Sequence, residues 1–180
     1  MSIGSDNQIM LQVKSGDIDK LGLLFERHKK PLYGYFYRRT TDRETSEDLV
    51  QTVFLRILKY RERYAGEGPF TVWMYRIARN VLCDAWKKKG GKNTVPLDPD
   101  RIENNTEAVN TEVYDERLVL LQKALDSLNK DQREAILLSR FQGLRYSEIG
   151  KILGCSEGAV KVRIFRALLH LKELYQKLDE

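Results

Sequence analysis

Apolar side chains recur along most of this chain with the spacing of an amphipathic α-helix, and almost nowhere with the alternation of a half-buried strand. The pattern predicts helices over about 6–13, 18–39, 42–64, 69–89, 112–128, 130–141, 146–153 and 157–178. Pro31 lies inside the second of these and predicts a kink, or a break near Lys30. Thr41 is expected to cap the third helix, with Glu44 reaching back as in a capping box. The sequence therefore predicts an all-α protein.

The helical pattern stops between residues 90 and 115. This segment opens with Gly90-Gly91, contains Pro96 and Pro99, and has more acidic than basic side chains, whereas basic side chains are in excess on both sides of it. Such a composition is typical of a solvated linker. We predict two small helical domains, 1–89 and 116–180, joined by a flexible acidic linker at 90–115.

Length and composition are those of an ordinary globular protein: 180 residues, 42% hydrophobic, with a formal net charge of +5. No apolar run is long enough to span a membrane, and the first residues do not resemble a secretory signal, so we expect no membrane insertion and a cytoplasmic location. Cys83 and Cys155 are isolated, and His28 and His170 lack neighbouring ligands. We therefore expect no disulfide scaffold, no metal and no cofactor.

The strongest local motif lies at 144–166, where a helix, a glycine turn and a second helix form a helix-turn-helix pattern. Gly154 is expected to end the first helix in a left-handed conformation, and Ser156 to cap the second. The apolar seam comprises Ile149, Leu153, Val160 and Ile164, and the outer face presents Ser156, Glu157, Lys161, Phe165 and Arg166. Such a helix fits the major groove of DNA, with Lys161, Arg163 and Arg166 neutralising phosphates. The alternative is a plain helical hairpin with a solvated basic face.

Two further patterns lie in the first domain. The helix from Pro69 places Arg76, Arg79, Asn80 and Lys87 on one face, close to the aromatic residues Tyr60, Tyr64, Phe70, Trp73 and Tyr75 around the loop at 61–68. Cations beside aromatic rings suit single-stranded nucleic acid, although most such rings are simply core. Leu55 lies among polar positions of the preceding helix, which indicates either a partner-binding surface or one ordinary exposed leucine.

Enzymatic patterns are absent from the sequence. Gly91-Lys92 lacks the remaining residues of a phosphate-binding loop, and no Ser or Cys has a histidine at a recognisable spacing. We expect neither an enzyme nor a small-molecule substrate. A stand-alone helix-turn-helix regulator would need an apolar ligand pocket or a dimer face in residues 1–89, whose polar positions are instead basic and aromatic. A helical adaptor that binds only proteins would leave the basic face at 161–166 unexplained.

The order of these parts resembles the bacterial RNA polymerase sigma factors of the extracytoplasmic-function (ECF) group, from about residue 17 to 174. The most specific runs are SEDLVQTVFLRI at 46–57 and FTVWMYRIARNVLCD at 70–84. The resemblance implies that 1–89 is sigma region 2 and 116–180 is sigma region 4. It also implies core RNA polymerase and promoter DNA as partners, an acidic linker threaded through the polymerase cleft, and an anti-sigma factor as a further partner.

The resemblance assigns roles to particular positions. Core polymerase would be bound by Asp48, Gln51, Phe54 and Leu55. The loop at 61–68 would hold a flipped base of the −10 strand, and the −10 contacts would be Arg61, Tyr64, Phe70, Trp73, Arg76, Arg79, Asn80 and Lys87. The −35 contacts would be Ser156, Glu157, Lys161, Val162, Arg163, Phe165 and Arg166. Arg145, Val162 and Leu168 depart from residues that are common in the family: a Ser or Thr cap, a serine and an arginine.

Overall fold

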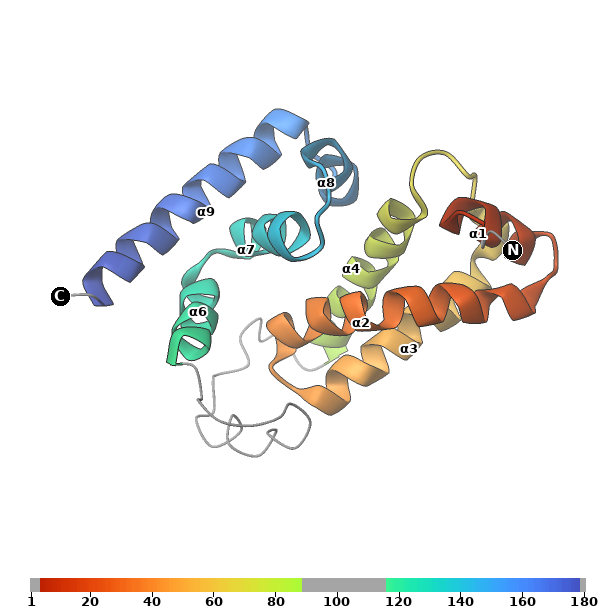
Figure 1. The fold of residues 1–180 in the computed structure, drawn as a ribbon, viewed down its shortest axis with the longest axis horizontal. Coiled ribbons are helices and arrows are strands. Elements are labelled where there is room, and N and C mark those ends of the chain that lie inside the picture. The colour runs from red at the N-terminus through yellow and green to blue at the C-terminus, as the bar shows by residue number, and fades with distance from the viewer. Residues whose placement is uncertain (1–3, 89–115, 179–180) are drawn as a thin grey trace. The chain divides into compact units, whose positions relative to one another are not determined.

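The computed structural model describes residues 4–88 and 116–178, and within these ranges the chain is helical with no strand. The chain forms two compact units, Met1–Pro99 and Asp100–Glu180 (Figure 1). The prediction of an all-α protein with two domains is confirmed. The predicted linker at 90–115 lies outside the described residues.

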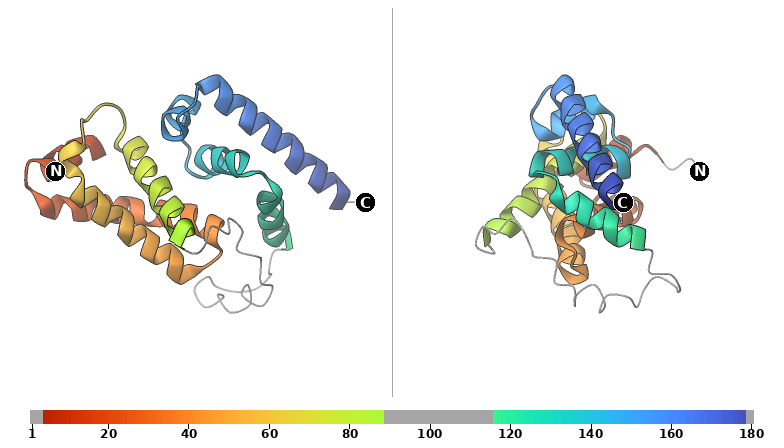
Figure 2. Two further views of the ribbon diagram at one scale, coloured as in Figure 1. Left: turned by 180° about the vertical axis from the view of Figure 1, so that it is seen from behind. Right: turned by 90° about the vertical axis from the view of Figure 1, so that its left-hand side faces the viewer.

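The first unit is a bundle in which α3 packs against both α2 and α4 (Figures 1 and 2). Its elements are α1 (Asp6–Lys14), the 3-10 turn η1 (Ile18–Lys20), α2 (Leu21–Thr40), α3 (Arg43–Lys59), the 3-10 turn η2 (Arg61–Arg63) and α4 (Phe70–Lys88). The largest fully buried side chains of this unit are Met10, Leu24, Leu32, Tyr35, Phe36, Ile57, Phe70, Met74 and Leu82. Burial of these side chains is the main source of stability for the unit.

The structure decides one alternative for this unit and corrects one prediction. Of the two possibilities at Pro31, a break near Lys30 is excluded, because α2 continues through Pro31 to Thr40. Thr41 does not cap α3: its φ is 51°, and it ends α2 in a left-handed conformation. Asp42 is the cap, and its carboxylate accepts a hydrogen bond of 2.7 Å from the backbone N–H of Thr45.

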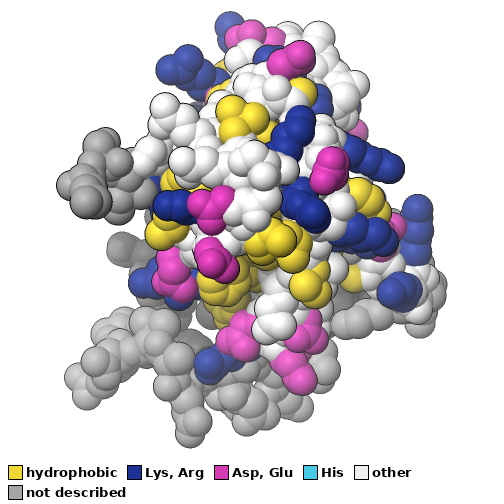
Figure 3. Space-filling view, turned by 90° about the vertical axis from the view of Figure 1, so that its right-hand side faces the viewer, with side chains coloured by type: hydrophobic (Ala, Val, Ile, Leu, Met, Phe, Trp, Pro, Cys, Tyr) yellow, Lys and Arg dark blue, Asp and Glu magenta, His cyan; other side chains and the backbone are white. Residues whose placement is uncertain are grey.

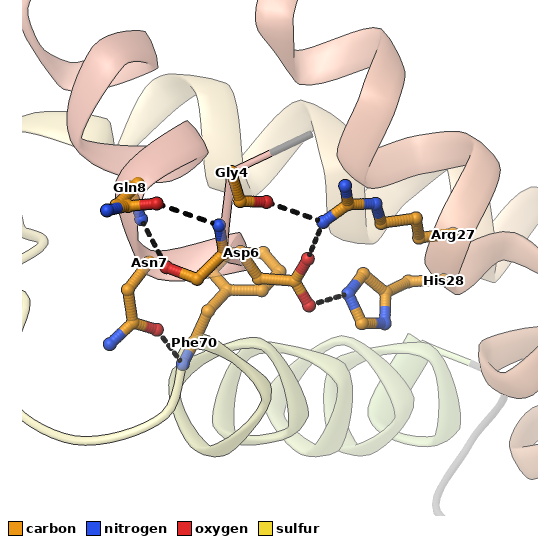
Figure 4. A network of polar contacts seen from close by, with 8 residues as sticks. Gly4, Asp6, Asn7, Gln8, Arg27, His28 and Phe70 are labelled. Atoms are coloured by element: carbon orange, nitrogen blue, oxygen red, sulfur yellow. Dashed lines mark hydrogen bonds and ion pairs between the residues drawn. The ribbon is translucent and has the colours of Figure 1, made fainter. Parts of the chain in front are cut away.

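A polar network fastens the start of α1 to α2 (Figure 4). The Asp6 carboxylate pairs with Arg27 and lies 2.7 Å from Nε2 of His28. Burial alone would raise the pKa of Asp6, but hydrogen bonds and charge from His28 and Arg27 outweigh it and hold that pKa below the ordinary 3.8. Ser5 and Gln8 complete a capping box at the same helix end.

Asp6→Asn is expected to lower the thermal stability of the first unit at neutral pH. A carboxyl whose pKa is depressed by folding contributes stability above its unfolded pKa and loses that contribution as the pH falls through its folded pKa. The deficit of the variant should therefore shrink as the pH drops below 3.8. Tryptophan fluorescence follows this unit selectively, because Trp73 and Trp86 are the chain's two tryptophans and both lie in α4. A deficit of the same size at acidic pH would show that the charge of Asp6 is irrelevant.

The second unit places α7 and α8 against the long helix α9. Its elements are α6 (Glu116–Ser127), α7 (Lys130–Ile136), the π-helical turn η3 (Leu137–Phe141), α8 (Tyr146–Leu153) and α9 (Glu157–Leu178). The predicted helix at 130–141 is thus an α-helix that widens in its last turn. Buried side chains of this unit include Leu125, Leu137, Leu138, Ile149, Val160, Ile164 and Ala167.

The turn between α8 and α9 has the predicted helix-turn-helix geometry. Gly154 has a φ of 70°, and the Ser156 hydroxyl accepts a hydrogen bond of 3.1 Å from the N–H of Ala159. A methyl group added at Gly150 would lie 2.7 Å from the carbonyl oxygen of Cys155, so this close approach requires glycine. Ile149, Val160 and Ile164 are buried as predicted, whereas Leu153 is only half-buried.

The first turn of α8 is only half capped. Arg145 occupies the N-cap position with extended backbone, and its N–H donates to the Glu148 carboxylate at 2.8 Å. A guanidinium has no hydrogen-bond acceptor, so the Arg145 side chain cannot accept a hydrogen bond from the backbone N–H groups in the first turn of α8. Arg145→Ser should add that bond and stabilise α8 by about 1 kcal/mol. Amide hydrogen exchange in α8 of the whole chain should slow about fivefold for Ser but not for the control Arg145→Ala. Equal exchange in the two variants would refute this account of the cap.

Candidate polymerase and nucleic-acid interfaces

The outer face of α3 carries the exposed leucine that the sequence singled out. Leu55 is 67% exposed, and Asp48 and Gln51 are exposed at offsets that place all three on one stripe of the helix. Hydrophobic side chains also reach the surface among charged ones elsewhere, as Figure 3 shows for one face of the molecule. Exposure of a leucine does not by itself indicate a partner-binding surface. Leu55 is distinguished by its high exposure within a stripe of polar residues.

Phe54 does not belong to this surface. It is 6% exposed and packs edge-to-face on Phe25 of α2, with 5.0 Å between the ring centroids. The expectation that Phe54 binds a partner directly is corrected: its ring is buried and packs α3 against α2.

A groove of about 490 Å³ runs between the end of α3, the turn η2 and α4. It is lined by Arg56, Tyr60, Arg63, Trp73, Ile77, Asn80, Cys83, Asp84 and Lys87. The Tyr60 ring has cations near it, with the Arg63 guanidinium 5.0 Å and the Lys59 ammonium 5.6 Å from its centroid. Flat rings and cations therefore converge in one open groove, as the binding of unpaired nucleotides requires.

The groove gathers some of the predicted −10 residues and excludes others. Trp73, Asn80 and Lys87 line it, and Arg76 is exposed on the same helix. Arg79 is half-buried. The half-buried Arg61 donates to the carbonyl oxygen of Leu58 at 3.0 Å, so part of its hydrogen-bonding capacity is used at the end of α3.

Tyr64 and Phe70 cannot stack on bases from where they lie. They are 2% and 1% exposed, and both rings pack beside Trp73, the former with 5.1 Å between centroids. The expectation that they contact DNA is corrected, because burial in the core leaves no ring face for a base. Their role is to support Trp73, the half-buried member of this cluster.

Sequence reasoning did not single out Arg56, Arg63 and Asp84, which also line the groove. The helix at 42–64 was predicted too long: α3 ends at Lys59, and Arg63 lies in the turn η2, within the loop predicted at 61–68. Arg56 pairs with Asp84 at 2.8 Å, joining α3 to α4 within the groove lining. The run Tyr60-Arg61-Glu62-Arg63-Tyr64, with two arginines between two tyrosines, was the signal in the sequence for Arg63.

The outer face of α9 is exposed where the sequence predicted DNA contacts. Phe165 is 61% exposed and Val162 48%, and Ser156, Glu157, Lys161 and Arg166 are exposed beside them. Arg163 is different, because it pairs with Asp131 of α7 at 3.3 Å and reaches the Cys155 sulfur at 3.4 Å. The Arg163 guanidinium therefore joins α9 to α7 and to the turn before α9. It is less available to phosphates than the exposed charged groups of Lys161 and Arg166.

The described residues contain no helix that is long and apolar enough to cross a membrane. Within the same ranges, no three His, Cys, Asp or Glu side chains gather as a metal site would require.

Comparison with known proteins identifies the family. The model of Sigma-70 region 2 matches residues 24–91, and that of Sigma-70 region 4 matches 118–171. The ECF RNA polymerase sigma factor SigF of Caulobacter vibrioides is 33% identical over 82% of this chain and 81% of its own length. The chain belongs to the RNA polymerase sigma factors of the ECF group.

Some relatives are longer than this chain. ECF RNA polymerase sigma factor BldN of Streptomyces coelicolor is 30% identical over 93% of this chain, which spans only 64% of that relative. Among solved structures, CnrH in complex with the cytosolic domain of CnrY shares the fold, with a TM-score of 0.76 at 24% identity over 97% of this chain and 99% of that one. The sigma factor RpoE in complex with the anti-sigma factor NepR, from Bartonella quintana, has a TM-score of 0.66 at 25% identity, over 89% and 97% of the two chains.

Proposed function

We propose that this protein binds core RNA polymerase and directs it to promoters by recognising −35 and −10 elements, so that transcription begins. The observation that carries the proposal is the presence, in one ECF-family chain, of an aromatic and cationic groove in the first unit and an exposed helix-turn-helix face in the second. In this proposal residues 1–89 act as region 2, 90–115 as linker and 116–180 as region 4.

The first unit would bind both polymerase and the opened −10 strand. Leu55, with Asp48 and Gln51, supplies the polymerase contact. The groove holds unpaired bases against Trp73 and Tyr60 while Arg63 and Lys87 neutralise phosphates. Stacking on an aromatic ring contributes about 1–3 kcal/mol per base, enough to offset much of the cost of unpairing. The loop at 61–68 holds an extruded base.

The second unit would read the −35 element through α9. The N-terminal half of a helix in the major groove contacts base edges, which here are met by Ser156, Glu157 and Val162. Lys161, one turn after Glu157, and Arg166, further along the helix, would reach phosphates. Phe165 offers an apolar contact to a thymine methyl group.

The proposal makes the protein a non-catalytic specificity subunit in the cytoplasm, with no small-molecule substrate. An anti-sigma factor is proposed as a further partner, since RpoE of Bartonella quintana was solved in complex with one. Such a partner would compete with polymerase for the exposed apolar side chains of either unit.

Reconstituted transcription tests the proposal. The protein is mixed with sigma-free core polymerase and a DNA pool randomised upstream of a reporter, and the transcribed templates are sequenced. Two enriched motifs at a fixed separation are expected, and only when both proteins are present. A stand-alone helix-turn-helix regulator would instead enrich a motif in a binding assay without polymerase and give no transcription.

The contacts of α9 predict how duplex binding depends on salt. Lys161→Ala and Arg166→Ala should each weaken binding of the whole chain to duplex DNA and lower the slope of log affinity against log salt by about 1. Phe165→Ala should relax sequence preference with the slope unchanged. Lys123→Ala, an exposed cation of α6, is the control and should change neither quantity. Slopes that equal the wild-type value in both cation variants would argue against phosphate contacts by α9.

A further inference from the structure

The helix α1 lies against the loop that joins η2 to α4. The Asn7 amide nitrogen donates to the carbonyl oxygen of Gly68 at 2.8 Å, and its oxygen accepts from the N–H of Phe70 at 2.7 Å. Figure 4 shows the second of these bonds at the first residue of α4. One side chain of α1 therefore holds both the end of the loop and the start of the helix that lines the groove.

A second side chain of α1 holds the other end of the loop. The Lys14 ammonium donates to the carbonyl oxygen of Tyr64 at 2.6 Å. Between these two points, the Leu11 side chain lies against Gly66, 3.5 Å from where a Cβ would stand. Contacts from three successive turns of α1 thus span the loop from residue 64 to residue 68.

The loop needs such support because of its own sequence. Gly66 and Gly68 have φ values of 75° and 79°, and glycine is the residue whose unfolded backbone is least restricted. A loop whose backbone is already fixed before binding loses no further conformational entropy when a base enters. The contacts from α1 therefore preorganise the loop for binding. The support itself is rigid, since Asp6, next to Asn7, is fastened to Arg27 and His28.

We propose that Asn7 and Lys14 are positioning residues for the loop that holds the extruded −10 base, so that α1 is part of the apparatus of −10 specificity. This inference rests on the proposed function. It goes beyond the region 2 match, which begins at residue 24 and does not include α1. In this proposal both residues act through the loop backbone, to which the Asn7 amide and the Lys14 ammonium are hydrogen-bonded.

The test compares variants of α1 in complete holoenzyme. Asn7→Leu removes both hydrogen bonds and keeps the branching at Cγ, Asn7→Asp keeps the acceptor for the Phe70 N–H, and Lys14→Met removes the bond to Tyr64. Gln8→Ala is the matched control, since it breaks the capping box of the same helix without touching the loop. Each holoenzyme transcribes the randomised DNA pool, and tryptophan fluorescence gives the stability of the first unit.

Asn7→Leu and Lys14→Met should lower base preference about fivefold at one or two adjacent −10 positions, with the −35 motif unchanged. Asn7→Asp should retain part of that preference, and Gln8→Ala all of it. If Asn7→Leu enriches the same motifs as the wild type, the role of α1 is overturned while the proposed function stands. The same conclusion follows if base preference falls equally at all positions and Gln8→Ala gives the same fall at an equal loss of stability. If the wild-type holoenzyme enriches no motif, the proposed function falls and this inference with it.

Discussion

Leu55→Arg is expected to lower the affinity for core RNA polymerase about a hundredfold, which corresponds to roughly 3 kcal/mol. The new guanidinium is solvated in the free protein, because the position is 67% exposed, but loses that solvation inside an apolar contact. The fold should be unaffected, with tryptophan fluorescence and thermal midpoint at their wild-type values. Fluorescence anisotropy of the labelled protein, titrated with core enzyme, gives the affinity.

Ile18→Arg is the matched control for this prediction. Ile18 is an exposed apolar residue, at 46%, in a turn that packs on α1 and α2. Its replacement should leave polymerase affinity unchanged. Equal affinities for Leu55→Arg and wild type would show that this stripe of α3 is solvated in the holoenzyme. Phe54→Ala cannot replace this test, because loss of a buried ring would destabilise the unit by about 3–5 kcal/mol.

The double change Arg76→Ala with Asn80→Ala is expected to slow open-complex formation on duplex promoters by at least about tenfold. Both side chains are exposed on α4, and Asn80 lines the groove, so they are placed to hold the displaced strand. Stopped-flow fluorescence of a base analogue in the −10 element measures the rate. A template unpaired across that element should recover most of the loss, because the unpairing cost has been removed.

The control for this second prediction is the double change Lys30→Ala with Gln12→Ala, which alters one exposed cation and one exposed amide elsewhere in the unit. Its opening rate should match that of the wild type. If the pre-opened template gives no recovery although the holoenzyme assembles, this face of α4 contributes binding and not strand separation.

Hydrophobic periodicity was sufficient to predict the two helices of the helix-turn-helix, but not all the helix ends of the first unit. The predicted bounds 146–153 and 157–178 agree with α8 and α9, since Gly154 and Ser156 are strong local signals. Thr41 and Asp42 are both good caps, and the choice between them depends on how tightly α2 turns into α3, which no local pattern encodes.

The errors among the candidate site residues share one cause. Tyr64 and Phe70 flank the loop at 65–69, and they are buried in a cluster with Trp73, where Phe70 lies beside His28 of α2. Phe54 is buried because Phe25 of α2 covers it. A helical pattern indicates which residues share a face, but a second element decides which aromatic rings remain accessible. The exposed Leu55 was recognisable because its neighbours on the stripe are polar.

If the loop between η2 and α4 holds the extruded base as proposed, its two glycines limit how the preference for −10 bases can diversify. At Gly66 and Gly68 any other side chain would strain the backbone, whereas Ala65 and Glu67 are exposed and have no such restriction. Under the proposed function, substitution at 65 and 67 would change the side chains that the loop presents to a base, while the backbone path set by the two glycines stays the same. Libraries that vary only these two positions are therefore expected to alter the preference for −10 bases and to leave the −35 preference unchanged.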